Sequence, residues 1–442
     1  MLRMPALFKR PTPELLAKPR TDFYIVPEKK KQQIMLYYIL LTMASAFAFN
    51  SPLEILTGFP KLIAASGILL TDFMYTGNVG AAFFNSGLLM LVAFLIAMKN
   101  KIQLNGPIIA AIFTIGGFAF FGKDIYNIWP IMLGVYLYSK FIGESFKTVI
   151  LLAFFGTALG PMVSQVTFAY KIPILFSLPL GIAVGVTAGF LLPILSSSLV
   201  RFHQGYNLYN TGFTAGFVGM VFMGIFRGFG FQNNPTYMIL EEPAPGLMIF
   251  LLALFFSMLA VGLYYTDRPT QKLMILWDQP GQLVSDFVSS DGFGVVMLNM
   301  GVLGLLGVIY VMVIGASFNG PVVGGIFTLA GFGAFGKHPK NALPVMAGVI
   351  LANIVFLWRF QTTSAVVATL FATTLAPIAG AYGIIPGLIA GFLHMTVVMN
   401  VGYLHGGMNL YNNGFSGGFV AGILIPIFDV ISANISRRKE RQ

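Results

Sequence analysis

The chain lacks cysteine entirely and carries few charged residues. Without cysteine it has no disulfide, no thiol nucleophile and no thiolate metal ligand. Of its 442 residues, 57% are hydrophobic and 9% are charged, which is too little polar surface to cover a soluble globule of this size. Sequence motifs for phosphate-binding loops, zinc sites and nucleophile elbows are also missing. The composition therefore indicates an integral membrane protein, and we expect no catalytic residue, metal or cofactor.

Long apolar stretches follow one another from Ile34 to Val430, interrupted by glycine, proline and short polar loops. This pattern predicts an all-α polytopic protein with many spanning helices. The 24 prolines and 50 glycines exceed what straight packed helices need. Several helices are therefore expected to be broken or re-entrant at membrane depth.

The net charge of +11 is concentrated at the two ends of the chain. Residues 1–33 hold eight Lys or Arg and three acidic residues. Residues 431–442 hold four Lys or Arg near the end of the chain, together with Glu440. By the positive-inside rule, both segments are predicted to be cytoplasmic. Anionic membrane lipids, and not nucleic acid, are their expected partners. Residues 1–33 have no apolar core followed by a small-residue cleavage site, so they are not expected to be a secretory signal peptide.

The chain is an internal duplication. The segment from His203 to Phe213 returns 202 residues later as the segment from His405 to Phe415. Farther upstream, matching residues are separated by 214 positions, as in Asn85 and Asn299. Duplicated halves in so apolar a chain are typical of membrane transport proteins. The predicted organisation is a first repeat at 34–226, a loop at 227–246 and a second repeat at 247–430.

Charges that do not repeat predict how the two halves are oriented. The loop Lys99-Asn100-Lys101 has two cations, whereas its counterpart Val313-Ile314-Gly315 has none. If the first loop is cytoplasmic and the second is external, this asymmetry follows from the positive-inside bias. We therefore expect two inverted structural repeats, each crossing the membrane an odd number of times.

Ten duplicated polar residues are the candidates for a solute path. Inverted repeats bring equivalent broken helices together near the membrane midplane, where amides provide donors and acceptors without the cost of a buried charge. Interhelical hydrogen bonding, helix capping and close glycine packing are the alternative roles. A proton-responsive role is open for the two histidines. The candidates are Asn85, Asn299, Asn207, Asn210, Asn409, Asn412, His203, His405, Thr214 and Ser416.

Three further duplicated pairs have simpler explanations at first sight. Two Asn-Gly-Pro sequences are expected to begin helices, with Asn as the cap and Pro in the first turn. Two aspartates are candidate helix caps or cation ligands. Two lysines follow helices whose C-termini they would complement, or they attract anions at opposite mouths of the path. These pairs are Asn105 and Asn319, Asp72 and Asp286, and Lys123 and Lys337.

The two halves resemble those of urea transporters in two segments. Phe84–Leu91 and Leu298–Leu305 are similar to the repeated Asn-rich segment of that family, and Tyr209-Asn210 and Tyr411-Asn412 are similar to its Tyr-Asn segment. The resemblance implies half-spanning helices, an oxygen-lined filter and a pore in each protomer of a homotrimer. It does not imply urea as substrate, because the Asn-Asn-Pro start is reduced here to one Asn without the proline. The whole chain also resembles an uncharacterised family of bacterial membrane proteins with a domain of unknown function.

These observations predict a channel or facilitative transporter for a small polar solute in the bacterial inner membrane. An ion-coupled transporter of a small anion is the nearest alternative. A membrane-embedded enzyme that uses the histidines and aspartates is the alternative of another class. Catalytic machinery is normally asymmetric because an acid and a base do different work, so the duplication of the polar residues favours transport and we do not expect an enzyme.

The inverted topology makes a direct prediction. Single cysteines placed at Lys99 and at Val313 in this cysteine-free chain should react with impermeant thiol reagents from opposite sides of the membrane. Labelling in right-side-out and inside-out vesicles measures this. Reaction of both positions from the same side would rule out the inverted arrangement.

Overall fold

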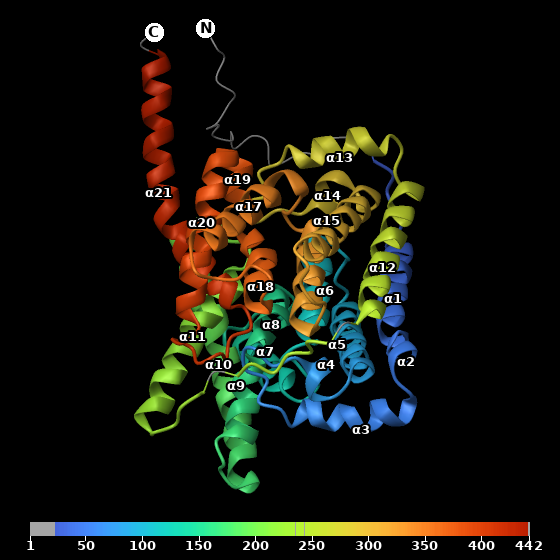
Figure 1. The fold of residues 1–442 in the computed structure, drawn as a ribbon, viewed down its shortest axis with the longest axis vertical. Coiled ribbons are helices and arrows are strands. Elements are labelled where there is room, and N and C mark those ends of the chain that lie inside the picture. Colours follow the sequence, from blue (N-terminus) through green and yellow to red (C-terminus); the bar gives the residue numbers. More distant parts are fainter. Residues whose placement is uncertain (1–22, 235, 243, 441–442) are drawn as a thin grey trace.

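The computed structural model describes residues 23–234, 236–242 and 244–440. This part of the chain is folded into helices joined by turns, with no β-strand (Figure 1). Ten of its helical segments are long and apolar enough to cross a membrane, which confirms the expectation of an all-α multi-pass membrane protein. Of the two basic terminal segments predicted to be cytoplasmic, residues 1–22 and 441–442 lie outside the described residues.

The two halves contain the same succession of elements, except that α2 of the first half has no separate counterpart in the second. The first half comprises α1 (Glu28–Ala44), α2 (Ala46–Phe49), α3 (Pro52–Ile63), α4 (Phe73–Thr76), α5 (Val79–Lys99), α6 (Gly106–Phe118), α7 (Ile128–Phe141), α8 (Ile150–Gly156), α9 (Gly160–Ser164), α10 (Ile174–Phe202) and α11 (Asn210–Gly228). The second half comprises α12 (Pro245–Tyr264), α13 (Pro269–Trp277), α14 (Phe287–Asp291), α15 (Phe293–Val313), α16 (Gly320–Gly331), α17 (Pro339–Val355), α18 (Thr363–Ala372), α19 (Ala376–Tyr382), α20 (Ile384–Val401) and α21 (Asn412–Glu440).

Helices α6 and α16 are the short apolar helices that follow the Asn-Gly-Pro sequences. The side chain of Asn105 accepts a hydrogen bond from the N–H of Ile108 at 3.0 Å, and that of Asn319 accepts from Val322 at 3.1 Å. The predicted N-caps are thus confirmed. The helices have 13 and 12 residues, so each is about 20 Å long and too short to cross a hydrocarbon core of about 30 Å.

The N-terminus of each short helix is held by an aspartate from the other half. The N–H of Gly106 donates to Asp286 Oδ1 at 2.9 Å, and Asp72 accepts from the N–H of Gly320. Each aspartate also caps the helix that directly follows it in sequence: Asp72 accepts from the N–H of Met74 in α4, and Asp286 accepts from that of Val288 in α14. The capping role is therefore confirmed, and it extends from one half to the other.

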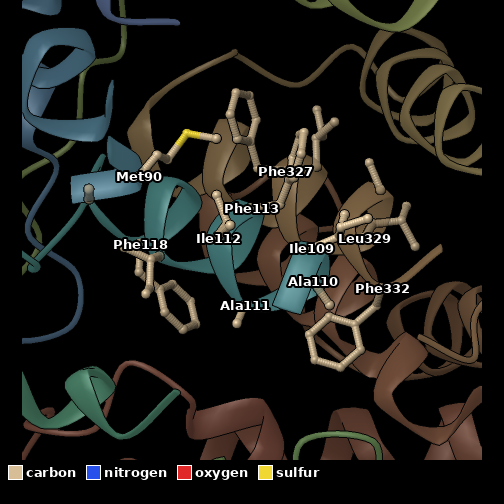
Figure 2. Close-up of a cluster of buried hydrophobic side chains, with 14 of the residues drawn as sticks. Met90, Ile109, Ala110, Ala111, Ile112, Phe113, Phe118, Phe327, Leu329 and Phe332 are labelled. Atoms are coloured by element: carbon tan, nitrogen blue, oxygen red, sulfur yellow. The ribbon is translucent and has the colours of Figure 1, made fainter. Parts of the chain in front are cut away.

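Helices α6 and α16 cross at the centre of the molecule, where glycine permits a close approach. A Cβ at Gly117 would lie 2.7 Å from the carbonyl oxygen of Gly324 and 3.2 Å from the Cβ of Phe327. Around this crossing, Phe113 and Phe327 pack with ring centroids 5.9 Å apart, and Figure 2 shows the surrounding apolar side chains of both helices. The two halves therefore share one hydrophobic core.

This crossing predicts a sharp difference between two glycine substitutions. Gly117→Ala should destabilise the protein by about 1–3 kcal/mol because the new methyl group meets a backbone carbonyl that cannot rotate away. Gly224→Ala in α11 is the matched control, since a Cβ there meets no atom within 4 Å and alanine favours a helix. Thermal unfolding of the detergent-solubilised protein measures both. A Gly117→Ala midpoint equal to that of the wild type would contradict the close crossing.

Candidate functional site

Two helices, one in each half, are broken at equivalent positions. Between α8 and α9 the chain forms a 3₁₀ turn at Thr157–Leu159, and between α18 and α19 it forms one at Thr373–Leu375. A proline follows each turn, Pro161 and Pro377. Proline has no N–H to donate and its ring collides with the carbonyl four residues earlier, which belongs to Thr157 or Thr373. The breaks are therefore specified by the sequence, as the abundance of proline predicted.

Each break is bridged by a loop from the other half of the chain. The N–H of Leu208, between α10 and α11, donates to the carbonyl of Thr374 at 3.0 Å. At the equivalent place, the N–H of Leu410 donates to the carbonyl of Ala158 at 3.1 Å. The loops that precede α11 and α21 thus supply backbone donors to the interrupted helices, and all four segments meet at the centre.

The predicted residues Asn207 and Asn409 fasten these loops across the two halves. Asn207 Nδ2 donates to the carbonyl of Gly414 at 2.9 Å, and Asn409 Nδ2 donates to that of Gly212 at 3.1 Å. Asn207 Oδ1 also accepts from Thr374 Oγ1 at 2.5 Å. Both side chains are fully buried. The structure therefore brings this pair to the centre of the molecule, in reciprocal contacts.

The remaining residues of the duplicated motif shape each loop from within. His203 Nε2 lies 2.9 Å from Asn210 Oδ1, and His405 Nε2 lies 2.9 Å from Asn412 Oδ1. Each Nδ1 accepts from a backbone N–H at 3.4 Å, which assigns the ring proton to Nε2. A neutral imidazole thus links the end of the preceding helix to the start of the next. The hydroxyls of Thr214 and Ser416 bond the carbonyls of the same asparagines, at 3.1 and 3.0 Å.

Asn85 and Asn299 lie beside the C-termini of the short helices. Asn85 Nδ2 donates to the carbonyls of Ala119 and Lys123 at 2.8 and 2.7 Å. Asn299 Nδ2 donates in the same way to Gly333 and Lys337, and its Oδ1 accepts from the indole of Trp277 at 3.0 Å. These contacts fix the turns that carry two lysines. A direct role for either amide in a solute path stays a prediction.

The two lysines that follow α6 and α16 are buried in the interior and not placed at opposite mouths. Lys337 Nζ donates to the hydroxyl of Tyr209 and, at 2.7 Å, to Thr373 Oγ1. Lys123 Nζ has no hydrogen-bond partner and lies 5.1 Å from the ring centroid of Phe118. Both side chains are fully buried. Their signal in the sequence was the repeated Phe-Gly-Lys, for which we expected either a role at helix C-termini or the attraction of anions at opposite mouths.

Neither lysine is paired with an acid. The ion pairs among the described residues join Lys31 to Glu28, Lys272 to Asp267 and Lys340 to Asp278. Burial of an unpaired ammonium costs several kcal/mol. A helix C-terminus offsets about 0.3–1 kcal/mol of that cost, and an aromatic ring about 0.5–2 kcal/mol. The local surroundings therefore compensate only part of the cost of placing Lys123 where it is.

Aromatic side chains fill the space between the two lysines. The rings of Tyr209 and Tyr411 have centroids 5.0 Å apart, and Tyr411 packs edge-on against Phe118 at 4.5 Å. Lys337 Nζ lies 4.5 Å from the ring of Tyr209 and 5.0 Å from that of Phe332.

In the described part of the chain, no group of three or more His, Asp or Glu is placed to hold a metal ion.

The asparagines at the helix ends yield a prediction of unequal effects. Asn299→Leu should lower the unfolding midpoint more than Asn85→Leu, because it leaves the indole of Trp277 without its acceptor as well as two carbonyls without donors. Each buried group left without a partner costs about 1 kcal/mol or more. Asn400→Leu, at an exposed position, is the control for the same substitution. Equal midpoints for the three variants in detergent would contradict these contacts.

Comparison with known proteins gives a family for the chain. No curated protein and no solved structure matches it. One family model matches residues 51–228 and 266–430, one block within each of the two halves described above; the blocks leave out α1, α2 and α12. The expectation of an uncharacterised family is thereby confirmed. This membrane protein belongs to the DUF1576 family, whose description is "Protein of unknown function".

Proposed function

We propose that this protein is a carrier for a small polar solute in the bacterial inner membrane, with its solute site between two inverted repeats. The observation that carries the proposal is the meeting of two equivalently broken helices at the centre, each bridged by the loop of the other half. A stretch of 3₁₀ geometry inside a longer helix often marks a functional hinge. In transporters built from repeats, such breaks surround the solute near the midplane.

An inverted relation between the halves is supported by the positions of equivalent helices. Helix α3 lies along one edge of the molecule, and its counterpart α13 lies along the opposite edge (Figure 1). Each half contributes five candidate spans, an odd number, so that equivalent elements can run in opposite directions. Shorter helices accompany them in each half, among them α3, α6 and α7 in the first and α13, α16 and α17 in the second. The unequal charges of the loops at 99–101 and 313–315 favour the same arrangement.

The closed centre favours a carrier over an open channel. Lys123, Lys337, Tyr209 and Tyr411 are each no more than 2% exposed, whereas the lining of an open pore is in contact with water. A carrier passes through such an occluded conformation between states that open to either side. The urea-transporter resemblance supports the half-spanning helices of this proposal. The homotrimer that it implies, and the binding of anionic lipids by the basic ends, remain proposals.

The enzymatic alternative has less support from the same contacts. The ring nitrogens of His203 and His405 are engaged by neighbouring amides, and the carboxylates of Asp72 and Asp286 cap helices. These groups hold the architecture together.

Reconstitution tests the carrier directly. Purified protein in liposomes should accelerate reswelling after an osmotic step with at least one solute from a panel of urea, small amides, polyols, short carboxylates and inorganic oxyanions. In Ala158→Cys, at one helix break, a thiol reagent should reduce that flux at least tenfold once it reaches the cysteine. Ala110→Cys, buried in α6, is the matched control and should keep its flux.

Two outcomes would contradict the carrier. One is flux no faster than in protein-free liposomes for every solute of the panel. The other is a fully labelled Ala158→Cys variant whose flux is unchanged.

A further inference from the structure

Resting on the carrier function proposed above, we propose that its solute is a small oxyanion, bound in the interior by the amines of Lys123 and Lys337. The two lysines occupy equivalent positions at the C-terminal ends of α6 and α16. Both are fully buried, and Lys123 Nζ has no hydrogen-bond partner. Ionisable side chains at membrane depth are rare and commonly belong to a solute or ion path, and Lys123 lacks the hydrogen-bond partner that a purely structural role would supply.

The acids closest in sequence or at the same helices are committed elsewhere. Asp124, which follows Lys123, accepts hydrogen bonds from the backbone N–H groups of Tyr126 and Asn127 at 2.8 and 3.0 Å, and from Asn127 Nδ2 at 2.6 Å. The residue that follows Lys337 is a histidine, so the second half has no acid at this place. Asp124 is as deeply buried as the lysines and balances one of the two amines, so a bound anion would balance the other.

The groups beside the amines suit an oxyanion in particular. Lys337 Nζ is bonded to the hydroxyls of Tyr209 and Thr373. The hydroxyl of Thr373 donates to the carbonyl of Leu370 at 2.6 Å, whereas that of Tyr209 can turn to donate to an oxygen ligand. In the other half, Tyr411 and Thr157 occupy the equivalent positions. An ammonium offers three donors and no acceptor, so the oxygens of a carboxylate, phosphate or sulfate are its natural partners. A neutral amide or polyol does not balance charge.

The asparagines predicted as site residues gain a defined place in this proposal. Asn85 and Asn299 hold the backbone carbonyls of Lys123 and Lys337, at 2.7 Å in each case. They are positioning residues, since they fix the turns from which the amines extend. Asn207 and Asn409 hold the loops that carry Tyr209 and Tyr411 in the same way.

The test compares charged and neutral solutes of similar size in proteoliposomes of the full chain. The probes are acetate against acetamide, and succinate, phosphate and sulfate against urea and glycerol. We expect protein-dependent uptake of at least one of the anions and of none of the neutral solutes. Lys123→Gln and Lys337→Gln should each reduce that uptake at least tenfold. Lys340→Gln is the matched control, since its amine is exposed and pairs with Asp278.

A binding measurement separates a solute site from a structural role. The transported anion should raise the unfolding midpoint of the detergent-solubilised wild-type protein, and this rise should vanish in Lys123→Gln. Without anion, the midpoint of Lys123→Gln should equal or exceed that of the wild type, because a fully buried amine without a hydrogen-bond partner has been removed. A lysine that only complements a helix end would give the reverse: a lower midpoint, with anion uptake intact.

The failure of this proposal can be told apart from failure of the carrier function. Uptake restricted to neutral solutes, or anion uptake that both glutamine variants retain, would overturn the anion site and leave a carrier. No uptake of any solute would overturn both.

Discussion

The rule that every backbone polar group must find a partner inside a membrane shapes this protein at its centre. A broken helix leaves carbonyl groups without their usual donors, and lipid offers none. Here the donors come from the other half of the chain, Leu208 for Thr374 and Leu410 for Ala158. Neither half satisfies its own break. Each repeat therefore depends on the other for the donors that its interrupted helix lacks.

The two halves also supply hydrogen-bond acceptors to each other at the N-termini of α6 and α16. Asp72 and Asp286 each cap a local turn and also reach the N-terminus of the short helix in the opposite half. A carboxylate there complements the positive end of the helix dipole. The negative ends lie inward, near Lys123 and Lys337. The charges of each short helix are thus arranged along its axis, with the acid supplied by one repeat and the amine by the other.

The sequence was informative about features that depend on local chemistry, and less so about features that depend on contact. The membrane class followed from composition, the caps Asn105 and Asn319 from spacing, and the helix breaks from proline. The reciprocal bonds of Asn207 and Asn409 were not predictable, because the partner carbonyls belong to glycines about 200 positions away and carry no side-chain signal. The lysines were predicted to complement helix C-termini or to lie at opposite mouths of the path, because the sequence cannot say how deeply a residue after a helix is buried.

Departures from the repeat bear on how the centre works. Thr374 donates to Asn207, whereas Ala158 at the equivalent place has no hydroxyl, and Asp124 corresponds to His338. Lys337 is bonded to two hydroxyls while Lys123 is free of partners. In a carrier made of two inverted repeats, opposite-facing states arise when equivalent segments adopt each other's conformations. In the present conformation the two equivalent lysines are bonded unequally. In the proposed carrier, an anion that moved from one amine to the other would leave the first lysine with hydroxyl partners and the second without them, or the reverse, and this difference would distinguish the two opposite-facing states.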